Sequence, residues 1–140
     1  MQQFLEFASN HLFLFAALAL VIVLLAQNLL AGSDKASIQP QAATTLINHQ
    51  EGVVVDIRPM TDYANGHIIN SINIPANGFK NQLARLEKYK QKPVIVTCRS
   101  GAQSSAACKQ LRNAGFEQVY NLRGGILAWQ NANLPTSRKK

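Results

Sequence analysis

The sequence predicts an α/β domain built on a parallel sheet that helices cover on both faces. Short runs of β-branched apolar residues alternate with amphipathic stretches, and glycine or proline residues separate most of them. Such alternation is typical of a parallel sheet. The 140 residues have room for one domain and an appendage, because domains usually contain about 100 to 150 residues.

The first expected element is a helix near the amino terminus. Residues 12–26 (LFLFAALALVIVLLA) are apolar without a break, and the apolar character resumes for three residues after Gln27 and Asn28. The span 12–31 has the length of about 20 residues that crosses a bilayer as a helix. We therefore expect an amino-terminal flank at 1–11 followed by a single transmembrane helix.

A cleaved signal peptide is the alternative interpretation of this segment. Such a peptide begins with positive charge and has a shorter apolar region, whereas this chain has no Lys or Arg before Lys35. A retained anchor fits better. By the positive-inside rule, the side of a membrane helix with more Lys and Arg faces the cytoplasm. No basic residue precedes this helix and Lys35 follows it, so the rule favours a cytoplasmic carboxyl-terminal domain.

The rest of the chain divides into a polar linker at 32–36, a domain at 37–134 and a basic tail at 135–140. Within the domain we expect, in order, a brief strand near Ser37 and Ile38, a helix over 40–50, a strand over 53–57, a helical turn over 62–67, a strand over 71–75, an amphipathic helix over 77–92, a strand over 93–97, a helix over 102–115, a strand over 116–122 and a last helix over 126–133.

Charge and cysteine content narrow the classes of partner. From Lys35 onward the chain carries fourteen basic and five acidic residues, a formal charge of +9, which favours anionic partners or merely a solvated basic surface. No aromatic-interleaved basic motif or zinc-spaced Cys/His set indicates nucleic acid or a metal. Two cysteines, Cys98 and Cys108, are too few for a disulfide framework and indicate reduced thiols.

The stretch PVIVTCRSGAQSS places Cys98 where a buried strand ends and a helix is about to begin. Ligands of open parallel sheets bind at this position. A helix amino terminus and a nearby cation, here Arg99, both lower the pKa of a cysteine. Gly101 allows successive backbone N–H groups to converge into an anion nest, and nearby hydroxyl and amide groups could add donors. Those groups belong to Ser100, Gln103, Ser104 and Ser105.

The alternative to a reactive cysteine is that Cys98 is an unreactive residue at a strand end and Arg99 is a solvent-exposed surface charge. The coincidence of several thiol-activating features favours a reactive cysteine instead. Cys108 lies inside the following helix without such features, and we assign it to the core.

Three segments make the chain resemble the rhodanese family of sulfurtransferases over roughly residues 36–134. They are VVVDIRP with DYANGHIINSINIP (53–75), CRSGAQS (98–104) and VYNLRGGILAW (119–129), in the order in which the family has them. Together with the expected anchor, the chain resembles membrane-attached single-domain rhodaneses of bacteria. This resemblance implies a place in the bacterial inner membrane.

The resemblance implies a persulfide mechanism, with Cys98 taking a sulfane sulfur from a donor such as thiosulfate and passing it to cyanide or another thiol, which could be carried by a protein. It implies no metal and no organic cofactor. Phosphatases of this fold use an arginine about six positions beyond the cysteine, where this chain has Ser104 and Ser105. The implied binding residues are Arg99, Ser100, Gly101, Ala102, Gln103 and Ser104.

Other residues of the matching segments are interpreted chiefly as structural. Asp56 and Arg58 follow a buried strand and are expected to form an ion pair, with possible support of the site as the alternative. His67 is expected to be structural, and Trp129 is expected to pack against the sheet.

Two further functions stay open from the sequence. The domain could be a non-catalytic adaptor or redox sensor that binds a protein partner, since fold does not dictate function. The basic tail and the basic residues of 77–92 could bind anionic lipid in addition to either role.

Overall fold

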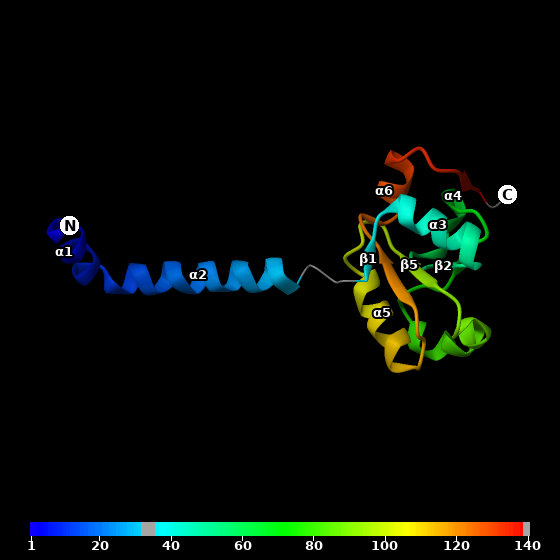
Figure 1. The fold of residues 1–140 in the computed structure, drawn as a ribbon, viewed down its shortest axis with the longest axis horizontal. Coiled ribbons are helices and arrows are strands. Elements are labelled where there is room, and N and C mark those ends of the chain that lie inside the picture. The colour runs from blue at the N-terminus through cyan, green and yellow to red at the C-terminus, as the bar shows by residue number, and fades with distance from the viewer. Residues whose placement is uncertain (32–35, 139–140) are drawn as a thin grey trace. The chain divides into compact units, whose positions relative to one another are not determined.

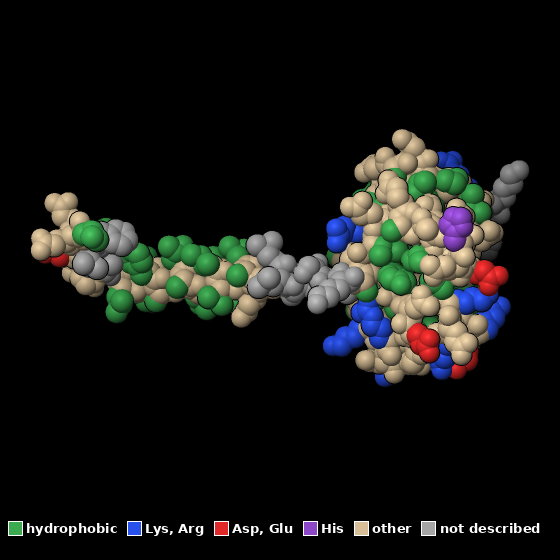
Figure 2. All heavy atoms as spheres, in the orientation of Figure 1, with side chains coloured by type: hydrophobic (Ala, Val, Ile, Leu, Met, Phe, Trp, Pro, Cys, Tyr) green, Lys and Arg blue, Asp and Glu red, His purple; other side chains and the backbone are tan. Residues whose placement is uncertain are grey.

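The computed structural model describes residues 1–31 and 36–138, and the chain divides into two compact units, Met1–Asp34 and Lys35–Lys140. The first unit contains α1 (Gln2–Asn10) and α2 (Leu12–Ala31). The ring of Phe7 packs against those of His11 and Phe15, with ring centroids 4.6 Å and 6.4 Å apart. These contacts join the two helices. Apolar side chains are exposed along α2, as Figure 2 shows.

The helix expected over 12–31 forms, but the prediction that it spans a membrane is wrong. Across the described parts of the chain, no helix is both long and apolar enough to cross a bilayer. The predicted inner-membrane location depended on this span, and the same finding overturns it; the predicted membrane-attached type is not confirmed.

The second unit is built on a five-stranded parallel sheet with the order β1-β6-β5-β2-β4 (Figure 1). Valines of the central strands lie opposite one another, with Val55 beside Val96 and Val94 beside Val119. The strands are β1 (Ser37–Ile38), β2 (Val53–Asp56), β4 (Ile72–Asn73), β5 (Val94–Thr97) and β6 (Val119–Leu122).

Helices cover both faces of the sheet, as the alternating pattern predicts. On one face, α3 (Pro40–Gln50) and α6 (Gly125–Asn131) pack in a core that includes Ile95 and Trp129. On the other face, η1 (Phe79–Tyr89) and α5 (Ser104–Asn113) pack in a core that includes Val94, Val96 and Leu111. Successive residues of β5 therefore enter opposite cores, because side chains of a strand alternate between its faces.

Two features differ from the sequence-based expectations. The amphipathic stretch forms a 3₁₀ helix, η1, whose apolar Leu83 and Leu86 suit its three-residue repeat. A small antiparallel pair, β3 (His67–Ile68) with β7 (Thr136–Ser137), was not expected, because two residues are too few to show a strand periodicity. The predicted helical turn is α4 (Met60–Asn65).

Candidate functional site

Cys98 lies directly after β5, at the edge of the sheet where the carboxyl ends of the parallel strands meet. It is 2% exposed and belongs to the core on the α5 side. Asp56 and Thr97 lie side by side at the ends of β2 and β5. The strand end thus carries the thiol to the edge at which ligands of open parallel sheets bind.

A bend from Arg99 to Gln103 connects the thiol to α5, and Gly101 shapes it. Gly101 has a φ of +91°, a conformation that other residues rarely adopt. Its backbone N–H donates a hydrogen bond to the Sγ of Cys98 over 3.0 Å. The bend therefore points a backbone donor at the sulfur, as the sequence predicts for an anion nest.

Ser104, the first residue of α5, completes the immediate surroundings of the sulfur. Its fully buried hydroxyl oxygen lies 3.4 Å from the Sγ of Cys98 and 3.2 Å from the carbonyl oxygen of Gly101. The same hydroxyl donates to the Oδ1 of Asn121 on β6, whose Nδ2 donates to the Gly101 carbonyl over 3.0 Å. Four side-chain and backbone groups are thereby connected in one buried network.

The hydrogen bonds around the sulfur act on the pKa of the thiol against the effect of burial. Burial raises the pKa of Cys98, but the hydrogen bond from the Ser104 hydroxyl lowers it. Hydrogen bonds from the backbone amides of Ser104, Ser100 and Gly101 lower it further, so the net pKa of the thiol lies below its ordinary value. The sequence pointed to the Arg99 cation, the helix dipole and the backbone N–H groups of the bend, and these N–H groups are among the causes that lower the pKa in the structure.

A second glycine turn, at Gly124 and Gly125, packs closely against the backbone of Cys98. Gly125 has a φ of +60°, and a Cβ at this position would overlap the carbonyl oxygen of Cys98 and the backbone of Arg99. The N–H of Ile126 donates to the Cys98 carbonyl over 2.9 Å, and that of Leu127 donates to the Arg99 carbonyl over 3.3 Å. The turn predicted at Gly124 and Gly125 therefore also holds the backbone of Cys98 and Arg99 in place.

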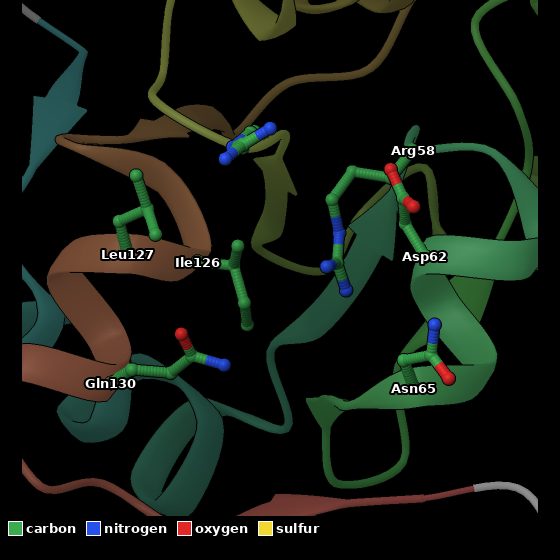
Figure 3. A pocket seen from close by; sticks show the side chains of 7 residues that line it. Arg58, Asp62, Asn65, Ile126, Leu127 and Gln130 are labelled. Carbon is green, nitrogen blue, oxygen red and sulfur yellow. The ribbon is translucent and has the colours of Figure 1, made fainter.

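Arg99 follows Cys98, and its exposed side chain lines a pocket of about 270 Å³. Arg58 lines the same pocket, and Figure 3 shows it with Asn65 across from Ile126 and Gln130 of α6. The other lining residues are Asp62 and Leu127. Two guanidinium groups beside amide side chains give the pocket a lining that suits a small anion.

Asp56 and Arg58 form the ion pair that the sequence predicts. The Nη2 of Arg58 lies 2.7 Å from the Oδ2 of Asp56, its Nε also donates to the carboxylate, and Asp56 is completely buried. The Nη2 also donates to the Gly66 carbonyl over 2.7 Å. The pair therefore ties the end of β2 to the turn after α4, and Arg58 forms part of the pocket wall.

The remaining loop residues spread outward from the sulfur. Ser100, Ala102 and Gln103 are exposed. Gln103 lines a separate, mostly apolar pocket of about 410 Å³ with Ile57 and Met60. The structure thus brings Gly101 and Ser104 to the sulfur, with the amide of Ser100, and places the side chains of Ala102 and Gln103 elsewhere.

Three residues singled out in the sequence have structural surroundings. The ring of His67 stacks on that of Tyr63 with centroids 3.9 Å apart, and its Nδ1 lies 2.7 Å from the Tyr63 carbonyl oxygen. Trp129 is buried in the α3–α6 core and donates from Nε1 to the Pro135 carbonyl. Cys108 is completely buried, and Cys98 is nearly so.

Asn121 is the site residue that the sequence did not reveal. It lies in the VYNL strand, is 6% exposed and pairs in register with Val96 on β5. An asparagine in an otherwise apolar buried strand is the signal that would have found it, because buried polar side chains need hydrogen-bond partners. Within residues 1–31 and 36–138, no three His, Cys, Asp or Glu side chains are grouped so that they could hold a metal ion.

Residues 39–132 match the model of the rhodanese-like domain. The uncharacterized protein YibN of Escherichia coli K12 is 38% identical over the full length of both chains. A sulfurtransferase of Allochromatium vinosum is 34% identical over 102 residues, which cover 73% of this chain and 90% of that protein. The crystal structure of a thiosulfate sulfurtransferase from Pseudomonas aeruginosa superposes with a TM-score of 0.65 at 25% identity, over 74% of this chain and 19% of that one.

Proposed function

Because the chain belongs to the rhodanese-like domain family, we propose that it is a sulfurtransferase that carries sulfane sulfur as a persulfide on Cys98. The observation that carries this proposal is the pair of groups at the sulfur: the Gly101 N–H donates to it, and the Ser104 hydroxyl lies 3.4 Å away, where it can donate to a thiolate. These donors favour a thiolate, which is the nucleophilic form of cysteine. The name of the A. vinosum relative supports the same chemistry.

The first half-reaction would load the cysteine. The Cys98 thiolate attacks the outer sulfur of a donor such as thiosulfate, a new S–S bond forms, and the S–S bond of thiosulfate breaks. Sulfite leaves with the electron pair of that bond. The terminal sulfur of the persulfide then carries the negative charge, and the N–H groups of the bend from Arg99 to Gln103 would hold it.

The second half-reaction would unload it. A thiolate or cyanide attacks the terminal sulfur, the S–S bond of the persulfide breaks, and Cys98 leaves as the thiolate. The products are an acceptor persulfide or thiocyanate, and the sulfur of Cys98 returns to its starting state. A cysteine whose pKa is lowered suits this step, because a thiol of lower pKa is a better leaving group.

The pocket next to the bend supports an anionic donor. Arg99 and Arg58 both line it, and Asn65 and Gln130 add amide groups. Arg58 is paired with Asp56, whereas Arg99 lies exposed beside the cysteine. We therefore assign the steering of the donor anion to Arg99 and the shape of the pocket wall to Arg58.

Mass spectrometry of the full-length protein after thiosulfate treatment tests this proposal directly. Trypsin cleaves after Arg99 and so places Cys98 and Cys108 on separate peptides. We expect the peptide that ends at Arg99 to gain one sulfur atom and the peptide with Cys108 to stay unmodified. Addition of cyanide should remove the extra sulfur and release thiocyanate.

The matched controls are Cys98→Ser, which should abolish turnover, and Cys108→Ser, which should preserve it because Cys108 is buried in the core. Normal thiosulfate:cyanide turnover by Cys98→Ser would exclude the mechanism. A folded protein whose Cys98 never gains sulfur from thiosulfate or from a small persulfide would also contradict it.

A further inference from the structure

The buried network behind Cys98 contains one residue that does not touch the sulfur, Asn121. Its two amide atoms have different partners, since Nδ2 donates to the Gly101 carbonyl and Oδ1 accepts from the Ser104 hydroxyl. The Ser104 hydroxyl lies 3.4 Å from the sulfur of Cys98, and the N–H of Gly101, the residue whose carbonyl Asn121 holds, donates to that sulfur. Asn121 is thus connected to the sulfur through two residues.

The Ser104 hydroxyl has a single proton and three acceptors around it. The acceptors are the Oδ1 of Asn121, the Gly101 carbonyl oxygen and the sulfur of Cys98. Because the Asn121 amide already donates to the Gly101 carbonyl, that oxygen does not need the serine proton. The proton is therefore shared between Asn121 and the sulfur.

The protonation state of Cys98 decides which of the two receives it. When Cys98 is a thiol, its S–H donates to the Ser104 oxygen, and the serine hydroxyl donates to Asn121. When the thiol proton has left to solvent, the hydroxyl turns to the negative sulfur, because hydrogen bonds to charged acceptors are stronger. We propose that Asn121 is a positioning residue, which holds the Gly101 carbonyl and so keeps the Ser104 hydroxyl free to donate to the sulfur.

Removal of Asn121 should mimic removal of the serine hydroxyl. Without the asparagine amide, the buried Gly101 carbonyl lacks its side-chain donor, and an unsatisfied buried acceptor is costly. The Ser104 oxygen lies 3.2 Å from that carbonyl and can donate to it as well as to the sulfur. The single hydroxyl proton is then divided between the two acceptors, so the hydrogen bond to the thiolate is weakened although Ser104 is still present.

Charged and titratable groups on the surrounding elements also act on the sulfur, but they are the same in every variant compared below. They therefore cancel in the comparison of Asn121 and Ser104 variants. They are Asp56 and Arg58 after β2, Tyr120 and Arg123 on and after β6, Arg99 in the bend, and Lys109 and Arg112 on α5.

Timed alkylation with iodoacetamide across a pH series, followed by tryptic mass spectrometry, tests the inference on the full chain. We expect Ser104→Ala and Asn121→Ala each to slow alkylation of Cys98 at neutral pH by about two- to tenfold, the worth of one hydrogen bond. In both variants the midpoint of the pH profile should move upward. The double variant should react no more slowly than the slower single variant.

Asn73→Ala is the matched control. Asn73 lies at the end of β4 and likewise donates to backbone carbonyls, those of Asp56 and Arg58. Its loss should leave the pH profile of Cys98 unchanged. An Asn121→Ala profile identical to that of the natural protein overturns the inference, and so does a double variant whose slowing equals the product of the two single effects.

Alkylation of Cys108 reports whether a variant is folded, because this thiol is completely buried. If Asn121→Ala exposes Cys108, Asn121→Leu takes its place, since it fills nearly the same volume without adding a charge but loses the donor to Gly101. This substitution should slow alkylation of Cys98 more in the protein that has Ser104 than in the Ser104→Ala variant. Equal slowing in the two proteins overturns the inference. The inference rests on the proposed function, but alkylation needs no sulfur donor, so the two can fail separately.

Discussion

The backbone of Gly125 lies against the carbonyl oxygen of Cys98 so closely that no Cβ fits between them. Ile126, the next residue, donates its N–H to the same carbonyl over 2.9 Å. The start of α6 thereby fixes the residue that carries the thiol. The position of the sulfur depends on a glycine that lies 27 residues further along the chain.

Gly125→Ala should destabilise the protein by roughly 2 to 4 kcal/mol, from a strained backbone together with an overlap with main-chain atoms. The matched control is Gly115→Ala, where φ is +93° but no atom lies within 4 Å of the added Cβ. It should cost only about 1 kcal/mol. Urea unfolding measures both, and equal losses for the two variants would show that the contact with Cys98 does not matter.

Arg99→Gln should raise the KM for thiosulfate about fivefold with little change in kcat. The lost attraction is about 1 kcal/mol for two charges 4 Å apart in water. Steady-state thiosulfate:cyanide kinetics measure this effect, which should shrink at high salt. Arg85→Gln, an exposed change on η1 where Arg85 contacts Gln82, should leave the KM unchanged. A kcat that falls while KM stays constant would assign Arg99 to the chemical step instead.

Arg58→Ala should destabilise the fold by about 3 to 5 kcal/mol, because it leaves the carboxylate of Asp56 buried without its partner. It also removes a donor from the Gly66 carbonyl. The double variant Asp56→Asn/Arg58→Ala should recover part of this loss. Denaturant unfolding checks both, and a loss under 1 kcal/mol for the single variant would mean that the pair is not needed to hold the turn after α4.

Ionisation of Cys98 should make the folded state more stable as the pH rises. The folded-state pKa of the thiol lies below its ordinary value, so the unfolded chain binds more protons between the two values. This contribution is fully present above the unfolded pKa and is lost as the pH falls through the folded pKa. We expect unfolding free energies of the natural protein and Cys98→Ser to diverge with rising pH across that window, and parallel curves would contradict the lowered pKa.

The sequence by itself determined the α/β class, the parallel sheet and the place of the thiol at a strand end. Runs of valine such as 53–55 indicate strands that are buried on both faces of a sheet. Glycine and proline residues end helices and strands through their effect on the backbone of adjacent residues, so both signals can be found in a short stretch of sequence. The Asp56–Arg58 ion pair could be predicted for the same reason, since the two residues are only two positions apart in the sequence.

Only the tertiary structure decided what surrounds the sulfur. Asn121 contacts Gly101 and Ser104, and Gly125 contacts Cys98, and no local pattern shows contacts between residues 17 or more positions apart. The hydropathy of 12–31 correctly predicted a helix, yet a membrane span requires length and apolarity together, and no described helix has both. Local order is encoded by neighbours in the chain, whereas the state of the Cys98 thiol depends on donors that folding brings together.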